Sequence, residues 1–237
     1  MRSYDQYCAL ARALDHVGPR WALLIVRELL LGPKRFTDLR AGLPGIANNL
    51  LADRLRQLQD DGLVSRRELP PPAASSVYEL TDAGEELREA VEALIRWGGR
   101  WMISGPGSDR FRGDWLALAL DALGVGARMG AETDIELIVD GESIRLGVID
   151  GRLTLRDRSD REPQLRVTAD PQTVLSVAAG ARSPAEALSE VTLEPDGPGA
   201  VQAFADIFSP STARETRTTG LAPHTTTEVT PVHTTTD

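Results

Sequence analysis

The sequence predicts an α+β fold in two consecutive parts. Helical periodicity and turn signals fill the first hundred residues, which end with one hairpin and a long helix. Short β-rich runs joined by Asp-Gly pairs follow Gly105-Pro106-Gly107-Ser108, and helical segments return behind them. We therefore expect a first domain over residues 1–104, a linker over 105–112, a second domain over 113–209, and a disordered threonine-rich tail over 210–237.

Length and composition fit a globular protein. A chain of 237 residues, 41% hydrophobic and 26% charged, can bury one large core or two ordinary ones. Its longest apolar runs, 21–26 and 115–120, are far shorter than a bilayer span, and its first residues lack a charged-then-apolar signal. We expect a cytoplasmic protein without a membrane partner.

Residues that carry catalytic or metal chemistry are sparse. Cys8 is the single cysteine, which excludes an internal disulfide framework and a multi-cysteine zinc site. His16, His224 and His233 are too scattered for metal-ligand spacing or a Ser/His/Asp arrangement. The second part also lacks a nucleophile with a base and a phosphate-binding loop. We therefore expect no enzyme activity, no metal and no cofactor.

The net charge of -9 is unevenly distributed. Residues 1–104 hold 14 basic and 14 acidic side chains, whereas residues 105–237 hold 12 basic and 21 acidic ones. Within residues 18–67, nine arginines or lysines stand against five acids. The locally basic segment is therefore the one with the helix-turn-helix pattern described next.

Three helices are expected between residues 20 and 61. Gly18-Pro19 and Gly32-Pro33 bound an apolar helix, and Thr37 is a plausible N-cap for a short second helix. Leu43-Pro44-Gly45 then forces a turn before a helix over 47–61. Three leucines at helical spacing give this last helix one buried stripe, with polar residues opposite: Leu51, Leu55 and Leu58 against Asn49, Asp53, Arg56 and Asp60.

A hairpin and an amphipathic helix complete the first part. A strand from Leu63-Val64 carries Arg66 and Arg67, and a second strand over 77–80 follows a loop of prolines and serines. A hairpin with a loose tip is a wing. From Thr81 a long helix begins that needs a partner for its apolar stripe, which comprises Leu87, Val91, Leu94, Trp97 and Trp101.

The second part is expected to pair its strands through two tight turns, Asp140-Gly141 and Asp150-Gly151. Alternating acids along one strand predict a solvated face: Asp134, Glu136, Asp140 and Glu142. The expected elements are a helix over 115–123, strands over 135–139, 143–149, 152–156 and 164–169, and helices over 171–179, 184–188 and 199–208.

Several linked motifs between Arg12 and Trp101 resemble the HxlR-type winged helix-turn-helix repressors. The matching runs are GPRWALLIVREL from Gly18, RFTDL from Arg35, NLLADRLRQL from Asn49, DGLV from Asp61 and YELTDAG from Tyr78. The resemblance implies a DNA-binding transcriptional regulator, a repressor, that acts as a homodimer on double-stranded DNA through its long helix. The sequence departs from the family mainly at the proline- and alanine-rich wing tip, 69–76.

On this resemblance, the polar face of the helix over 47–61 reads base edges with Asn48, Asn49, Asp53 and Arg56. Phosphate contacts are expected from Lys34, Arg35, Arg54, Arg66 and Arg67. For any one of these side chains the alternative is a solvated charge or an intramolecular salt bridge.

Two features leave alternatives open. Cys8 lies just before the first helix, where some HxlR-type regulators carry a redox-sensing cysteine; the alternative is a small buried hydrophobic residue. Trp97 and Trp101 are expected at the dimer interface, and a ligand pocket between the domains is the alternative.

Residues 113–208 resemble a sterol-carrier-protein type domain, through strands paired by Asp-Gly turns, a helix, a Pro-Ala-Glu-Ala stretch and a closing helix. That resemblance implies a sheet covered by helices around an apolar cavity, and thus an apolar small-molecule effector. The alternatives are a packing module without a ligand, or a lipid carrier with a vestigial winged helix.

Overall fold

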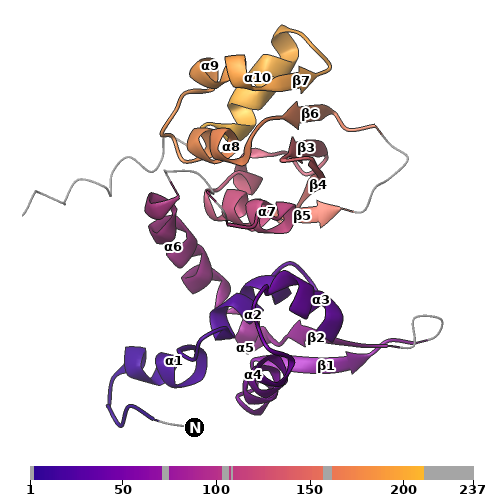
Figure 1. The fold of residues 1–237 in the computed structure, drawn as a ribbon. Helices are drawn as coiled ribbons and strands as arrows, with labels where there is room; N and C mark the ends of the chain where they lie inside the picture. Colours follow the sequence, from indigo (N-terminus) through magenta and orange to yellow (C-terminus); the bar gives the residue numbers. More distant parts are fainter. Residues whose placement is uncertain (1–2, 71–74, 103–106, 108, 157–161, 211–237) are drawn as a thin grey trace, which may run out of the picture.

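The computed structural model describes residues 3–70, 75–102, 107, 109–156 and 162–210. Figure 1 shows two domains, with α6 running from the first toward the second. The first domain consists of α1 (Ala9–Val17), α2 (Ala22–Leu29), α3 (Phe36–Gly42), α4 (Asn48–Asp60), β1 (Val64–Glu68), β2 (Ser76–Leu80), α5 (Asp82–Glu85), α6 (Arg88–Gly98) and the 3-10 turn η1 (Gly99–Trp101).

Helices α2, α3 and α4 form the predicted helix-turn-helix around one apolar core. The predicted leucine stripe of α4 is confirmed: Leu51, Leu55 and Leu58 are buried against α2 and α3. Thr37 as the N-cap of α3 was wrong. The N-cap is Arg35 and the helix begins at Phe36, two residues earlier, because the Asp38 carboxylate accepts a hydrogen bond from the backbone N–H of Arg35 and closes the first turn there.

The hairpin is an antiparallel pair in which Arg66 lies opposite Tyr78. Tyr78 also exchanges two backbone hydrogen bonds with Lys34, at 2.9 and 2.8 Å. The base of the wing is therefore tied to the segment between α2 and α3. The predicted wing tip lies partly outside the described residues.

The long helix expected from Thr81 is broken into α5 and α6. The Thr81 hydroxyl caps α5, but the Leu87 N–H bonds the Gly84 carbonyl at 3.2 Å, three residues back. Gly84 lies against the carbonyl of Leu63 with no room for a Cβ. The break lets α6 leave the hairpin and reach the second domain.

The second domain is a five-stranded mixed sheet with helices, in the strand order β5-β4-β3-β6-β7. Strands β3 and β6 are parallel, and the other neighbours are antiparallel. Its elements are α7 (Gly113–Ala122), η2 (Gly126–Arg128), β3 (Ile135–Val139), β4 (Glu142–Ile149), β5 (Arg152–Arg156), β6 (Leu165–Thr168), α8 (Pro171–Ala178), α9 (Pro184–Ala187), η3 (Leu188–Glu190), β7 (Thr192–Glu194) and α10 (Pro198–Phe208).

Both Asp-Gly turns are confirmed, because both residues of each pair have positive φ angles. Strand β7 was not predicted, since its three residues give no usable alternation. The predicted tail from residue 211 onward and much of the predicted linker lie outside the described residues. Among the described helices, none combines the length and the hydropathy that a bilayer crossing requires.

The two faces of the sheet differ sharply. Ile135, Leu137 and Val139 are fully buried in the core with the helices. At the alternate positions, the prediction of a solvated acidic face was partly wrong. Asp134 is buried and accepts two hydrogen bonds from Arg145, and Glu136 accepts a hydrogen bond from Arg166 at 2.7 Å. Arginines from adjacent strands neutralise these acids, a pairing that a single strand's pattern does not reveal.

The two domains share a small apolar cluster. Leu118 of α7 packs with Val26 of α2, with Leu30 directly after α2 and with Val91 of α6, and all four are buried. Helix α7 thus rests directly on the first domain, close to its helix-turn-helix.

Candidate nucleic-acid interface

Helix α4 presents a polar face opposite its leucine stripe. Asn48, Asn49, Asp53 and Arg56 are all exposed along it. The helix has no side-chain cap and no acid in its first turn. The partial positive charge of its first N–H groups is therefore not compensated by a side chain. The face can therefore attract a phosphate at its start and offer amide and guanidinium groups to base edges.

Arg56 is paired within this face. Its guanidinium lies 2.9 Å from the Asp53 carboxylate one turn earlier, and both side chains are well exposed, at 68% and 60%. An exposed pair at this spacing is worth under about 1 kcal/mol. Arg56 can therefore leave Asp53 for another acceptor at little cost.

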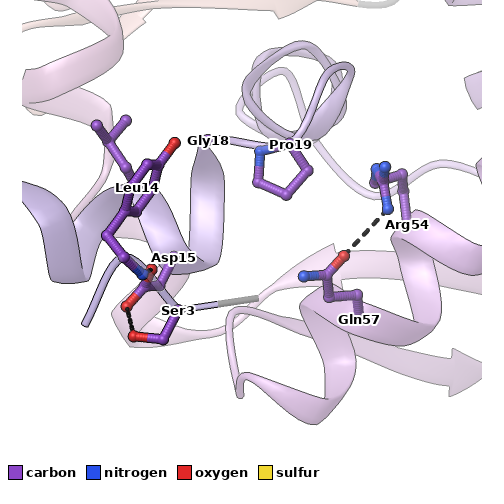
Figure 2. A pocket seen from close by; sticks show the side chains of 8 residues that line it. Ser3, Leu14, Asp15, Gly18, Pro19, Arg54 and Gln57 are labelled. Carbon is purple, nitrogen blue, oxygen red and sulfur yellow. Dashed lines mark hydrogen bonds between the residues drawn. The ribbon is translucent and has the colours of Figure 1, made fainter. Parts of the chain in front are cut away.

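Arg54 is held differently, on the flank of α4. Its guanidinium donates to the Arg20 carbonyl and to the Gln57 side chain, each at 3.2 Å. Figure 2 shows it lining a hollow of about 570 Å³ together with Pro19, Gln57 and the start of the chain. Arg54 thus joins α4 to the segment before α2.

The same hollow is bounded by Asp15 of α1, which fixes the N-terminal segment. Its carboxylate accepts hydrogen bonds from the Tyr4 N–H at 2.9 Å and the Ser3 hydroxyl at 3.1 Å. These bonds, the Tyr4 one first, lower the pKa of Asp15 despite the opposing effect of burial. The residues around Cys8 are therefore anchored on both sides.

Lys34 and Arg35 are separated by the fold. The Lys34 ammonium is 14% exposed and turns inward, 2.8 Å from the Glu28 carboxylate and 3.7 Å from Asp114. Arg35 is exposed at the start of α3. Of the two, Arg35 is the side chain free to approach a duplex.

The two wing arginines also differ. Arg67 forks onto Glu79 of the facing strand with three short contacts of 2.9 to 3.0 Å, which lower the pKa of Glu79. Within the described part of the wing, the ion pair of Arg66 is a 3.5 Å contact with the highly exposed Glu68. Arg66 is therefore the more available cation on the wing.

A buried carboxylate lies behind this interface, and the sequence reasoning missed it. Glu28 of α2 is fully buried and accepts hydrogen bonds from Arg27 at 2.7 Å, Lys34 at 2.8 Å and the Trp115 indole N–H at 2.7 Å. Desolvation lowers the pKa of Arg27, and the neighbouring Glu28 carboxylate partly offsets this decrease. The available signal was an adjacent arginine and glutamate near the end of an apolar helix. The distant partner Trp115 gave no signal.

The predicted apolar stripe of the long helix is divided. Val91 is 5% exposed and faces its own chain's core, with Leu87 packed beside it. Leu94, Trp97 and Trp101 are exposed, and the two tryptophan rings stack edge-on with centroids 4.5 Å apart. Exposed apolar side chains also mark α1 and the segment before it: Tyr4, Tyr7, Leu10 and Leu14.

Cys8 is exposed immediately before α1. The alternative of a small buried hydrophobic residue is therefore wrong for the single chain.

The helix-turn-helix, the wing and the polar outer face of α4 define a winged-helix DNA-binding protein. A family model described as HxlR-like helix-turn-helix matches residues 16–105. The uncharacterized HTH-type transcriptional regulator YvaP of Bacillus subtilis is 34% identical over 91 residues, which cover 38% of this chain and 84% of that protein. The uncharacterized HTH-type transcriptional regulator YtfH of Escherichia coli is 36% identical over 94 residues, 40% of this chain and 75% of that one.

Solved structures match the same share of the chain. The reduced form of the transcriptional regulator YodB from B. subtilis is 31% identical and covers 42% of this chain and 99% of its own, with a TM-score of 0.37. The chain belongs to the HxlR-like helix-turn-helix family and is a DNA-binding transcriptional regulator. The named relatives are regulators, not enzymes. The family model ends at residue 105, so the second domain lies outside it.

Proposed function

We propose that this protein is a repressor that binds double-stranded DNA as a homodimer, with α4 in the major groove of each half-site. The observation that carries the proposal is the exposed polar face of α4 opposite a fully buried leucine stripe. This arrangement leaves α4 rigidly seated and its outer side available to a partner.

Base readout is assigned to Asn48, Asn49 and Arg56. An asparagine can bind adenine and an arginine guanine through paired hydrogen bonds, each worth about 1–3 kcal/mol of discrimination. Asp53 orients Arg56 until DNA replaces it. Arg35 and Arg66 are assigned to phosphates, because neither has a strong partner among the described residues.

Lys34, Arg54 and Arg67 are assigned a supporting role. Each was expected at a phosphate, but each is already engaged inside the chain, by Glu28, by Arg20 and Gln57, or by Glu79. They hold the wing base, the flank of α4 and the hairpin in place for the residues that touch DNA.

Dimerisation is assigned to α6 and α1. The exposed Leu94, Trp97 and Trp101 form an apolar strip that a second copy would cover, whereas Leu87 and Val91 support it from inside. Cys8, exposed at the start of α1, stays a candidate thiol sensor.

We assign the second domain, residues 113–209, to a sterol-carrier-protein type fold. We propose that this domain binds an apolar effector. The support is its architecture, a five-stranded sheet packed against helices. Effector binding would then change the DNA affinity of the first domain.

Selection of bound duplexes from a random pool, at two salt concentrations, tests the proposed function. We expect a palindromic consensus and an affinity that falls steeply with salt. Asn49→Ala and Arg56→Ala should each lose about 1–3 kcal/mol of operator binding and relax specificity at one position. Gln202→Ala, at an exposed position of α10, is the matched control and should bind as the unmodified protein does. If the protein binds no duplex at low salt, the proposed function is wrong and the alternative, a lipid carrier with a vestigial winged helix, is favoured.

A further inference from the structure

An apolar groove runs where the end of α6 and η1 meet α7 and α8. It consists of two adjoining hollows of about 330 and 340 Å³. Met102, Ala119, Gln172 and Leu175 line both, so the hollows are two lobes of one groove. Together the lobes reach the size of ordinary small-molecule sites.

The chemistry of the groove is aromatic with a positive rim. Trp101, Phe111 and Trp115 line one lobe, and Ile95 and Leu123 line the other. The charged side chains on the rim are three arginines and one aspartate, namely Arg96, Arg100, Arg110 and Asp109.

Arg110 is exposed and forms no hydrogen bond or ion pair with any residue that the structure describes. Arg96 and Arg100, in contrast, are held by backbone carbonyls, at 2.9 and 3.0 Å. An apolar ligand with a negative group fits this rim better than a neutral or cationic one, because the arginines outnumber the single acid.

The interior of the second domain offers less. Between its sheet and its helices the space is occupied by fully buried side chains, among them Phe204, Phe208, Val174 and Val177. An effector that enters without repacking this core would therefore bind in the groove.

Trp115 connects the groove to the DNA-binding domain. Its side chain lines the groove, the Arg27 guanidinium lies 4.3 Å from the ring centroid, and its indole N–H donates to Glu28 at 2.7 Å. Movement of this ring would act directly on a buried carboxylate.

Glu28 in turn contacts two parts of the DNA-binding domain, the base of the wing and the end of α3. It binds the Lys34 ammonium, and the Lys34 backbone pairs with Tyr78 in the wing. Its neighbour Arg27 donates to the Gly42 carbonyl at the end of α3, at 3.2 Å, and Gly42 has no room for a Cβ against the Glu28 carboxylate. Wing and turn are thus both packed around the group that Trp115 contacts.

We propose that the groove binds an apolar, ring-containing carboxylate, and that Trp115 couples its occupancy to DNA affinity through Glu28. The inference rests on the proposed function, since it names the effector class and the route of regulation. The bound ring lies against Trp115 and Leu175, and its acidic group lies at Arg110.

Fluorescence titration of the full chain with anilinonaphthalene sulfonate, an aromatic anion, tests the groove. The neutral phenylnaphthylamine is the matched probe. We expect the anion to bind about tenfold more tightly, Arg110→Ala to reduce that preference, and Ala119→Trp to abolish binding by filling both lobes. Arg182→Ala, in the loop between α8 and α9 and outside the groove lining, is the control and should leave this preference unchanged. Equal binding of both probes, or binding that survives Ala119→Trp, would overturn the proposal. Binding to the monomer alone would also overturn it, because a second copy would then occupy the groove in the dimer.

Operator affinity with and without the anionic probe tests the coupling. We expect a change of about fivefold or more in the unmodified protein. Trp115→Phe keeps the ring but removes the N–H, so it should still bind the probe while losing most of that change. An unchanged effect in Trp115→Phe would overturn the coupling. If the protein binds no DNA at all, the proposed function is wrong, but the probe titration still tests whether the groove binds an aromatic anion.

Discussion

Two carboxylates, Glu28 fully buried and Asp121 partly buried, illustrate how single residues behave in this protein. Glu28 is surrounded by two cations and an indole N–H, so its charge is matched on every side that the structure describes. Asp121 of α7 accepts one backbone hydrogen bond, from the Leu153 N–H of β5 at 2.7 Å. Burial raises the pKa of Asp121, although that bond and the more distant Arg88 and Arg152 oppose the rise.

Asp121 predicts a pH dependence of stability with a definite sign. Because its folded pKa lies above the ordinary 3.8, its contribution is fully present below that value and is lost as the pH rises through the folded pKa. Asp121→Asn keeps an acceptor for Leu153 but cannot ionise. We expect its free energy of unfolding, relative to the unmodified protein, to be most favourable at neutral pH and to lose that advantage toward pH 4.

Urea denaturation of both proteins across this pH range is the measurement, and the difference between them cancels the other titrating groups. Asp121→Ala, which leaves the Leu153 N–H unpaired, should cost about 1–3 kcal/mol at all pH values. A difference between Asp121→Asn and the unmodified protein that does not vary with pH would contradict the assignment.

At the scale of elements, the wing separates two neighbouring arginines. Arg66→Ala should weaken binding uniformly across DNA sequences and reduce the slope of log affinity against log salt by about 0.9, because one phosphate contact is lost. Arg67→Ala should leave that slope nearly unchanged, since Glu79 already neutralises Arg67. Filter binding at several salt concentrations measures both slopes, and equal losses would show that Arg67 leaves Glu79 for DNA.

Helix α6 carries the dimer prediction. Trp97→Glu places a charge in the exposed apolar strip, so we expect a monomer by sedimentation and a loss of operator affinity of about tenfold or more. The helix itself should stay folded, because Trp97 is 54% exposed in the single chain. Gln202→Glu on α10 is the control, and a dimer that persists in Trp97→Glu would place the interface elsewhere.

Local patterns predicted the elements better than their joints. The leucine spacing of α4 and the Asp-Gly turns fixed a helix and two hairpins, because both signals depend on residues only a few positions apart. The break before α6 follows Gly84, which packs against the Leu63 carbonyl of a distant segment, and local periodicity gives no signal of such a contact. The predicted stripe therefore merged Val91, which is buried, with Trp97, which is exposed.

The candidate site followed the same division. The exposed face of α4 could be listed from helical periodicity, but the inward turn of Lys34 could not. It depends on Glu28 and on Asp114 of the second domain, and Glu28 is in turn bound by Trp115, 87 residues further along the chain. A buried acid satisfied by another domain leaves no periodic signal in one sequence.

At the scale of the whole molecule, the two domains are joined by more than the linker. Arg96 of α6 donates to the Ala122 carbonyl at 2.9 Å, and Arg152 of β5 reaches Glu92 of α6 at 3.3 Å. The exposed Arg152–Glu92 pair contributes little, and the Arg96 bond is a single, partly buried hydrogen bond. The apolar cluster around Leu118, buried between the domains, is the stronger connection.

Leu118 therefore decides whether the domains unfold together. We expect the unmodified chain to lose α4 and β3 in one transition, measured by hydrogen exchange at increasing urea. Leu118→Ala should cost about 2–5 kcal/mol and let the two elements exchange in separate transitions, because the removed side chain lies between the domains. Leu137→Ala, inside the sheet, should cost a similar amount yet keep one transition as long as the cluster is intact. Separate transitions in the unmodified chain would mean that the interface is too weak to couple the domains, and the route from the groove to the helix-turn-helix would then lack a mechanical basis.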